Sequence, residues 1–295
     1  VIASGDTMIA ARDRNGLRPL CYGKTDTGLH VIASETSALD IVGAEYVRDI
    51  EPGEIFVARL NGQTESHYLE GPKQENFCFF ELVYFARPDS QYKNSLIYNY
   101  RMELGKQLAR NSKDIEADMV IPVPDSGNVA AIGYSHESGI PYMEGLIKNR
   151  YVGRTFIHPT PEMRERIIQL KLNPLTEVLR GQRLVVVDDS IVRGNTSKKL
   201  VKMLRDCGVK EIHLRISSAQ VKSPCFYGID MSVPEELIAN KMSIEEIRDW
   251  LGVDSLGYLS VDDMRQVGNN LPYCMACFNG EYPAGKPANE AVSVC

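Results

Sequence analysis

The segment VVVDDSIVRGNTS, residues 185–197, constrains the fold of this chain more than any other stretch. Its three consecutive β-branched residues predict a strand that is buried on both faces of a parallel sheet. Asp188 and Asp189 follow at the carboxyl end of that strand, where open α/β sheets bind their ligands. Gly194 permits a close approach of the backbone, and a Thr-Ser pair stands at the start of a predicted helix, whose free N–H groups favour phosphate. The segment therefore predicts a site for a sugar phosphate.

A simpler interpretation applies to the acidic pair alone, because two aspartates after a strand are often a solvated strand end that caps the next helix. The whole segment, however, resembles the PRPP-binding signature of the type I phosphoribosyltransferases, in which hydrophobic residues precede two acids and a phosphate loop of small residues. This resemblance implies that Asp188 and Asp189 contact the ribose hydroxyls. It also implies five residues around the 5′-phosphate: Arg193, Gly194, Asn195, Thr196 and Ser197.

Length and charge set broad limits on the function. The 295 residues suffice for two modest domains, and no apolar run approaches the length of a membrane span. Since no signal-like N-terminus is visible, we expect a cytoplasmic protein that does not contact membranes. The net charge of −6 argues against nonspecific nucleic-acid binding. A highly anionic substrate therefore requires a local basic cluster, and one short region supplies it: Lys148, Arg150, Arg154, Arg164, Arg166 and Lys171.

Residues 1–72 have the pattern of antiparallel β-structure. A turn signal at residues 13–16 separates two extended runs, and the strand GLHVIAS precedes a helix predicted over residues 37–47. The Asn61-Gly62 pair predicts a hairpin, and Gly71-Pro72 marks the domain boundary. Because so few hairpins scarcely enclose a core, we expect residues 1–72 to be the end of a larger β-rich domain.

The rest of the chain alternates strands and helices, which predicts a parallel sheet wrapped by helices. Helices are expected over residues 99–111 and 126–137, on either side of the strand in MVIPVPDSGN. The turn after that strand could hold a second anion on the backbone amides of four residues: Asp125, Ser126, Gly127 and Asn128. The segment GRTFIHPTPEMRER is typical of a mobile lid, although an inert surface loop has a similar composition.

Seven cysteines form the second informative group. In an intracellular chain they are more typical of metal ligands or thiols than of disulfides. Four of them lie in apolar sequence surroundings: Cys78, Cys225, Cys274 and Cys277. Four thiolates satisfy either zinc or an iron–sulfur cluster, and a single C-x-x-C pair favours zinc on spacing alone. A buried cysteine without any role is the simpler interpretation, and we interpret Cys21 and Cys207 in that way.

Six ordered blocks carry a more specific resemblance: MIAARDRNGLRPLCYG, FFELVYFARPDS, PVPDSGNVAAIGY, KNRYVGRTFI, VVVDDSIVRGNTS and PYCMACF. Together they resemble the glutamine phosphoribosylpyrophosphate amidotransferases over essentially the whole chain. This resemblance implies an α/β fold, with a type I phosphoribosyltransferase domain and its central parallel sheet in residues 73–262. Residues 1–72 would be the C-terminal β-rich remnant of an Ntn-hydrolase glutaminase domain, and residues 263–295 a C-terminal segment with cluster ligands.

The same resemblance implies cofactors and their ligands. It replaces zinc by a [4Fe–4S] cluster on four thiolates: Cys78, Cys225, Cys274 and Cys277. It implies Mg²⁺ at three side chains: Ser126, Asp188 and Asp189. Lys148 and Arg154 would neutralise the pyrophosphate when the lid closes, and the cluster, being far in sequence from the phosphate loop, is expected to be structural. The family is typically oligomeric and inhibited by purine nucleotides.

The implied reaction is the first step of de novo purine synthesis, in which ammonia drawn from glutamine displaces the pyrophosphate of PRPP to give 5-phosphoribosylamine. The family's glutaminase uses an N-terminal cysteine, and Val1 is not a nucleophile. We therefore expect the chain as written to use free ammonia at most. Two other functions remain: a PRPP sensor without catalysis, and a salvage phosphoribosyltransferase. The lid cations favour turnover, and no helix-turn-helix or basic arm is visible.

Overall fold

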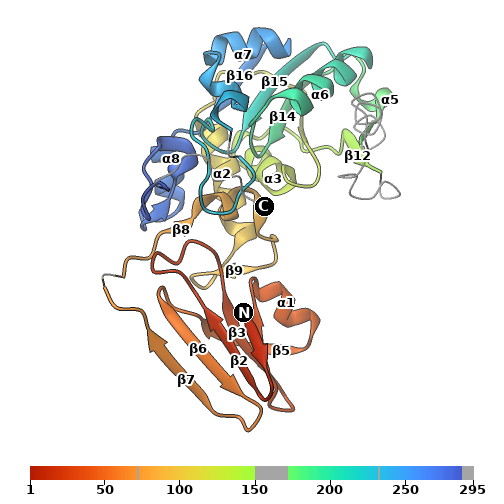
Figure 1. Ribbon diagram of the computed structural model, residues 1–295. Coiled ribbons are helices and arrows are strands. Elements are labelled where there is room, and N and C mark those ends of the chain that lie inside the picture. The colour runs from red at the N-terminus through yellow and green to blue at the C-terminus, as the bar shows by residue number, and fades with distance from the viewer. Residues whose placement is uncertain (72, 150–171, 232, 288–295) are drawn as a thin grey trace, which may run out of the picture.

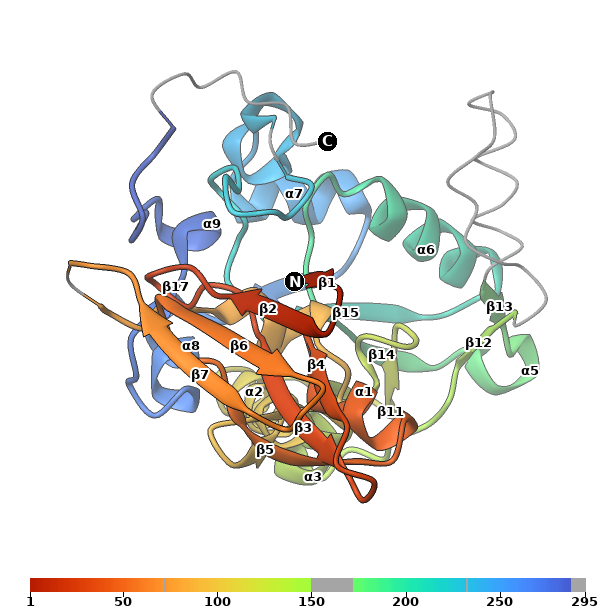
Figure 2. The ribbon, with the colours of Figure 1, turned by 60° about the horizontal axis from the view of Figure 1, so that its bottom comes forward.

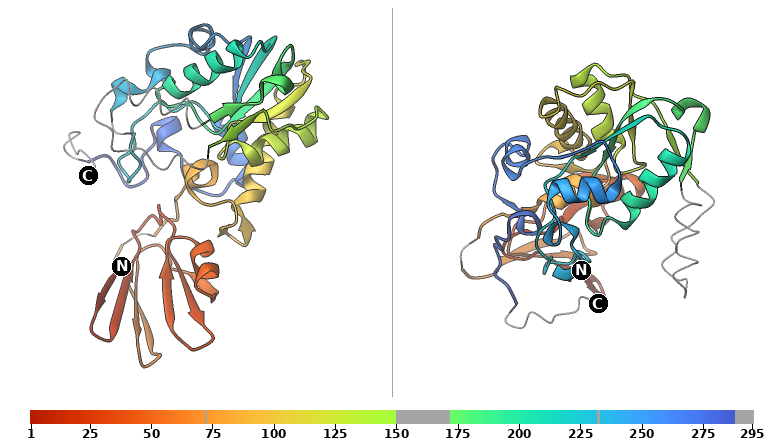
Figure 3. Two further views of the ribbon diagram at one scale, coloured as in Figure 1. Left: turned by 90° about the vertical axis from the view of Figure 1, so that its right-hand side faces the viewer. Right: turned by 90° about the horizontal axis from the view of Figure 1, so that it is seen from above.

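The structure is a computed structural model and describes residues 1–71, 73–149, 172–231 and 233–287. Its N-terminal part is rich in β-strands and lies below a larger α/β part in Figure 1. The same two parts are separated along the vertical direction in the left view of Figure 3. Among the described residues, no helix has both the length and the apolar character needed to cross a membrane.

Two antiparallel sheets form the N-terminal part (Figure 2). Their strands, with the helix between β4 and β5, are β1 (Ile2–Ser4), β2 (Thr7–Ala11), β3 (Cys21–Thr25), β4 (His30–Ala33), α1 (Thr36–Ile41), β5 (Ala44–Asp49), β6 (Glu54–Arg59) and β7 (Thr64–Tyr68). The strand orders are β1-β2-β6-β7 and β4-β3-β5. The sheets meet through Tyr22 and Phe56, whose ring centroids lie 4.7 Å apart, in a small core with Ile50 and Ala58.

Two details of this part differ from the sequence-based expectations. The turn at residues 13–16 is present, but it joins the two sheets, because β2 pairs with β6 whereas β3 pairs with β4 and β5. The helix predicted over residues 37–47 is wrong beyond Ile41, because Gly43 takes a positive φ of 66° and the following residues pair with β3 as β5. The Asn61-Gly62 hairpin is confirmed by the pairing of β6 with β7.

The α/β part contains a parallel sheet between two layers of helices. Its main elements are α2 (Ile97–Arg110), β11 (Met119–Pro122), α3 (Asn128–Ser138), β14 (Arg183–Asp188), α6 (Asn195–Asp206), β15 (Glu211–Ile216), α7 (Ile244–Leu251) and β16 (Ser255–Tyr258). The strand order is β11-β14-β15-β16, and every pair is parallel. Alternate side chains of β14 face opposite layers: Val185 and Val187 share a core with α2 and α3, whereas Val186 shares one with α6 and α7. This double burial confirms the strand predicted from the continuous apolar run.

Shorter elements connect these layers. They are β8 (Phe77–Cys78), the π-helical turn η1 (Glu81–Phe85), β9 (Gln91–Tyr92), β10 (Ser95–Leu96), β12 (Leu146–Lys148), β13 (Leu172–Pro174), α5 (Thr176–Leu179), the 3₁₀ turns η2 (Pro234–Glu236) and η3 (Ile238–Asn240), α8 (Val261–Val267), β17 (Tyr273–Cys274) and α9 (Ala276–Asn279). Strand β8 pairs with β17. This pairing brings the C-terminal segment to the start of the α/β part.

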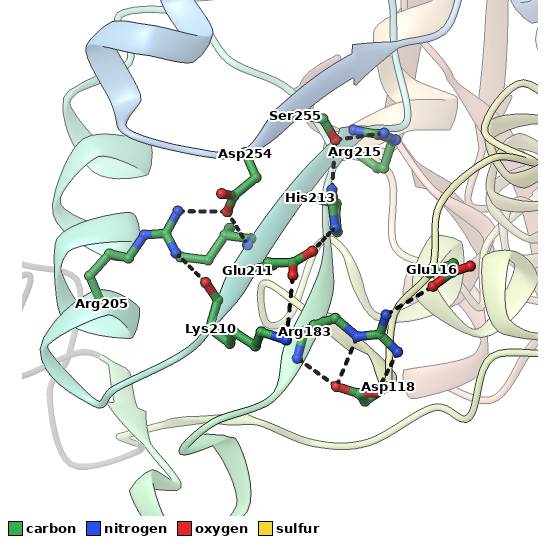
Figure 4. A network of polar contacts seen from close by, with 11 residues as sticks. Glu116, Asp118, Arg183, Arg205, Lys210, Glu211, His213, Arg215, Asp254 and Ser255 are labelled. Carbon is green, nitrogen blue, oxygen red and sulfur yellow. Dashed lines mark hydrogen bonds and ion pairs between the residues drawn. The ribbon is translucent and has the colours of Figure 1, made fainter.

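Polar contacts fix the amino ends of the parallel strands (Figure 4). At the start of β14, the guanidinium of Arg183 donates to the carboxylate of Asp118, just before β11, over 3.0 Å. The carboxylate of Asp254, just before β16, accepts from the guanidinium of Arg205 and from the backbone N–H of Ile212, both over 2.6 Å. These hydrogen bonds and ion pairs lie at the amino ends of the strands. They leave the carboxyl ends, where parallel sheets bind ligands, available for a binding site.

Candidate active site

Asp188 and Asp189 stand at the carboxyl end of β14, as the sequence predicted. Only 9% and 5% of their surfaces are exposed. The backbone N–H of Asp189 donates to a carboxylate oxygen of Asp188 over 2.9 Å, and the hydroxyl of Ser190 donates to the carboxylate of Asp189. Two adjacent carboxylates are thus held in a largely water-free position at the end of a central strand.

Burial dominates the ionisation of this pair. It raises the pKa of Asp188 well above its usual value, and the nearby carboxylate of Asp189 raises the pKa further. Burial also raises the pKa of Asp189, but hydrogen bonds from Ser126 and Ser190 partly oppose that effect. The link from Ser126 to Asp189 brings the turn after β11 to the acids. A cation or a set of hydroxyl donors at this position would therefore lower both pKa values.

The predicted phosphate loop follows the acids and leads into α6. Gly194 takes a positive φ of 79° and precedes the first helical residue, Asn195. Asn195 and Thr196 are exposed, and Ser197 is buried. Arg193 is exposed and pairs with Glu236 over 2.5 Å, so its charge is already partly compensated. Because Arg193, Asn195 and Thr196 are exposed, a ligand can reach the N–H groups at the start of α6.

The turn after β11 forms one side of a cleft. Gly127 is buried against β14, where a Cβ atom would lie 2.3 Å from the carbonyl oxygen of Val187. Asp125 is exposed and pairs with Lys148 of β12. The side-chain oxygen of Asn128, the first residue of α3, is buried and has no hydrogen-bond partner. Asp125, Asn128 and Lys148 line a common cleft with Tyr142 and Glu144.

Most of the predicted lid lies outside the described residues. Lys148 lies at this cleft. Arg154 lies outside the described residues, as do the lid segment GRTFIHPTPEMRER and the other cations of that region, Arg150, Arg164, Arg166 and Lys171. The roles assigned to them remain predictions.

The four cysteines singled out from the sequence gather around one cavity: Cys78, Cys225, Cys274 and Cys277. Cys78 of β8 and Cys274 of β17 are direct partners in the parallel pairing. Burial raises the pKa of Cys78 to about 12, and the pKa of Cys277 is raised by burial and by the other three thiols. Leu17 and Arg18 of the N-terminal part line the same cavity.

Within the described ranges, no group of three or more His, Cys, Asp or Glu side chains is arranged to hold a single metal ion. The cysteines therefore do not form the compact four-ligand arrangement of a zinc site. Cys21 and Cys207 are buried and lie outside this cavity.

Arg101 of α2 belongs to none of the sequence motifs above. The residue is 4% exposed, and its guanidinium donates to the carbonyl oxygens of Leu82 and Ala86 over 2.9 and 2.7 Å. Burial lowers the pKa of Arg101, and the charge of Asp189 is the largest opposing influence. The spacing with Leu104 and Leu108 was the available signal, because it places an arginine on the apolar face of a helix.

Comparisons with known proteins agree with this fold. Residues 90–222 match the phosphoribosyl transferase domain family, and residues 1–67 match the class-II glutamine amidotransferases. The amidophosphoribosyltransferase of a Synechocystis species is 51% identical over 97% of this chain and 58% of its own length. That of Archaeoglobus fulgidus is 48% identical over 97% of this chain and 63% of its own length. The chain therefore spans less than two thirds of these relatives.

A solved structure gives the same result. The glutamine phosphoribosylpyrophosphate amidotransferase from B. subtilis, complexed with ADP and GMP, superimposes with a TM-score of 0.86 and 48% identity over 94% of this chain and 62% of that chain. In sequence and fold, this chain thus joins part of a class-II glutamine amidotransferase domain to a phosphoribosyl transferase domain, and over 97% of its length it is similar to the amidophosphoribosyltransferases.

Proposed function

We propose that this chain transfers the phosphoribosyl group of PRPP to ammonia, as the phosphoribosyl-transferring half of an amidophosphoribosyltransferase of purine synthesis. One observation carries the proposal. The buried pair Asp188 and Asp189 precedes the predicted phosphate loop at residues 193–197 and is linked through Ser126 to a second turn at residues 125–128. A substrate with a ribose diol between two phosphate groups matches that arrangement.

Each part of the site has a distinct role in this proposal. Asp188 and Asp189 accept hydrogen bonds from the ribose hydroxyls and so fix the orientation of the ring. The N–H groups and hydroxyls of the loop from Arg193 to Ser197 bind the 5′-phosphate. The amides from Asp125 to Asn128 receive the pyrophosphate, and Lys148 of the same cleft neutralises part of its charge.

The reaction is a substitution at the anomeric carbon with inversion. The C1–O bond to pyrophosphate breaks, the ammonia lone pair forms the C1–N bond, and the nitrogen then loses a proton. The ring gains oxocarbenium character while negative charge grows on the leaving pyrophosphate. Donors that are already in place stabilise this charge without reorganisation. The exclusion of water, which would compete with ammonia, is assigned to the lid.

The acids also fit a magnesium ion. Mg²⁺ is usually held by one or two carboxylates together with substrate phosphates, and the buried carboxylates of Asp188 and Asp189, with the hydroxyl of Ser126, supply oxygen ligands of that type. Bound there, the ion would offset the negative charge of the two carboxylates and of the pyrophosphate. A set of two carboxylates and one hydroxyl is not a complete cage without substrate.

The cysteine cavity fits an iron–sulfur cluster better than zinc. Four buried thiols surround one cavity, yet no three described side chains are arranged for a single ion. A [4Fe–4S] cluster binds each thiolate at a different iron, so its ligands surround an object rather than a point. We propose a structural role, because Cys78 and Cys274 join two paired strands at the junction with the N-terminal part.

The function is tested by measuring pyrophosphate release from PRPP and Mg²⁺ by this chain. Release that depends on ammonia supports the proposal. PRPP binding without release indicates a sensor, and release only with a free purine base indicates a salvage enzyme. Glutamine is added in a parallel assay, in which glutamate formation reports any glutaminase activity.

The same proposal extends to regulation and assembly. The B. subtilis relative was solved with ADP and GMP, so we propose purine nucleotides as inhibitors of the activity of this chain. We further propose a homo-oligomer in the cytoplasm. Nucleotide inhibition of the ammonia-dependent rate and sedimentation of the purified chain test these two points.

A further inference from the structure

The single tryptophan of this chain, Trp250, lies against the phosphate loop. It belongs to α7, which is separated from the loop in sequence by α6 and β15. A Cβ atom on Gly194 would lie 2.9 Å from Cζ3 of the Trp250 ring and 2.8 Å from Cδ1 of Ile238. The loop glycine is therefore seated directly on two side chains that no sequence motif connects with it.

Other contacts hold the loop in the same position. The backbone N–H of Ile238 donates to the carbonyl oxygen of Val192 over 3.0 Å, just before the loop. The ammonium of Lys198, in the first turns of α6, lies 5.1 Å from the centroid of the Trp250 ring and donates to the Trp250 carbonyl oxygen. The indole is partly buried and packs against the core that α6 and α7 share.

These contacts act on the loop in two ways. The ring supports Gly194 in its left-handed conformation, which sets the direction of the first N–H groups of α6. Through a cation–π contact, the ring also holds the Lys198 ammonium on the α7 side of the helix, in addition to the hydrogen bond to the Trp250 backbone carbonyl oxygen. Without the ring, Gly194 loses its support, and Lys198 keeps only its hydrogen bond to the backbone carbonyl oxygen of residue 250.

We propose that Trp250 is a positioning residue for the 5′-phosphate subsite, holding Gly194 and Lys198 so that the start of α6 receives the phosphate. This inference rests on the proposed function. It also makes the emission of Trp250 a reporter of this subsite, because no other tryptophan contributes to it.

Three variants test the proposal: Trp250→Ala, Trp250→Phe and Leu251→Ala. Leu251, the next residue of α7, is 2% exposed in the same core, so its truncation loosens the helix without removing the ring. Titration calorimetry measures the binding of ribose 5-phosphate, of PRPP with Mg²⁺ and of inorganic pyrophosphate, well below each unfolding temperature.

We expect Trp250→Ala to lower the affinities for ribose 5-phosphate and for PRPP by a common factor of roughly tenfold, a typical size for an effect that acts through a neighbouring residue. Pyrophosphate binding should stay unchanged, and Trp250→Phe should restore most of the affinity because an aromatic ring remains. Wild-type affinity for ribose 5-phosphate in Trp250→Ala overturns the proposal. So does an equal loss in Leu251→Ala, or an equal loss of pyrophosphate.

The wild-type protein gives a measurement that needs no variant. Saturating ribose 5-phosphate should shift the Trp250 emission, whereas pyrophosphate should not, and an unchanged emission with bound ribose 5-phosphate contradicts the proposal. If the wild-type chain binds none of the three ligands, the proposed function fails as a whole. If it binds them but the variants bind equally well, only the role of Trp250 fails.

Discussion

Gly127 is pressed onto Val187: a Cβ atom on the glycine would lie 2.3 Å from the valine carbonyl oxygen and 2.9 Å from that of Val123. The Val187 carbonyl also accepts from the backbone N–H of Val123 over 2.8 Å. Val187 directly precedes Asp188. The turn proposed for pyrophosphate and the acids proposed for ribose are therefore fixed relative to one another by backbone contacts.

Replacement of Gly127 by alanine should separate these two subsites. The added methyl group meets backbone atoms, which cannot move aside as a flexible side chain can, so we expect a loss of about 1–3 kcal/mol in the free energy of unfolding and weaker PRPP binding. Urea unfolding and calorimetry measure the two effects. Gly139→Ala, at the other end of α3, is the control: no atom lies within 4 Å, so only the left-handed backbone is penalised, by about 1 kcal/mol. Wild-type PRPP binding in Gly127→Ala would contradict the arrangement.

Replacement of Asp188 by asparagine tests the ribose contact. The amide keeps the shape but loses the charged acceptor, so we expect ammonia-dependent turnover to fall by ~10²-fold or more. Steady-state pyrophosphate release measures the effect. Asp249→Asn, on the exposed surface of α7, serves as a surface control. An unchanged rate in Asp188→Asn would remove Asp188 from the site.

The stability of the ligand-free protein should depend on pH through the same pair. Burial raises the pKa of Asp188 in the folded state, whereas an unfolded aspartate titrates near ~3.9. The folded protein thus binds more protons between these two values, so this contribution is complete below the unfolded pKa and is lost as pH rises through the folded pKa. With EDTA present, the denaturant midpoint should fall less from pH 5 to pH 7.5 in Asp188→Asn than in the wild type. A larger fall in the variant would contradict the prediction, because it would mean that ionisation of the pair does not destabilise the folded protein.

The sequence predicted the central strand, the position of the acids at its end and the glycine before α6 because all three are local patterns. Apolar β-branched residues, adjacent carboxylates and a glycine before a helix lie within thirteen residues, and each keeps its meaning without tertiary information. The helix over residues 37–47 was wrong beyond Ile41 because Gly43 and the pairing of β5 with β3 decide its end. Strand pairing between distant residues overrides local helical preference.

Contacts made by distant elements could not be predicted. Trp250 meets Gly194 only because α7 packs beside α6. The cysteines illustrate the intermediate case: their apolar surroundings indicated a common site, and the structure gathers all four, but spacing alone favoured zinc. The spacing of cysteines in the sequence indicates which of them could be ligands. Which group they bind depends on the distances between the thiols in the folded chain.

The contact between the two parts of the chain should depend on Arg18. Its guanidinium lies 2.8 Å from the carboxylate of Glu81, which is 3% exposed. Because Arg18→Ala leaves that buried carboxylate without its cation, we expect a loss of about 1–3 kcal/mol in the free energy of unfolding. Arg87→Ala is the control, since its pair with Asp89 is exposed on both sides and should change stability by at most about 0.5 kcal/mol. Equal unfolding curves for the two variants would show that the Arg18 pair adds nothing to the junction.

The cysteine cavity makes the last prediction. Anaerobically purified protein should contain about four irons and as many acid-labile sulfides per chain, as the cluster requires, and Cys225→Ala should lose most of both. Because the cluster would join β8, β17 and the segment around Cys225, its removal by oxidation and chelation should lower the thermal unfolding midpoint. Cys207→Ala, buried outside the cavity, should keep its iron. Bound zinc without sulfide would refute the iron–sulfur cluster. An unchanged unfolding midpoint after iron removal would refute its structural role, because the protein would then be equally stable without the cluster.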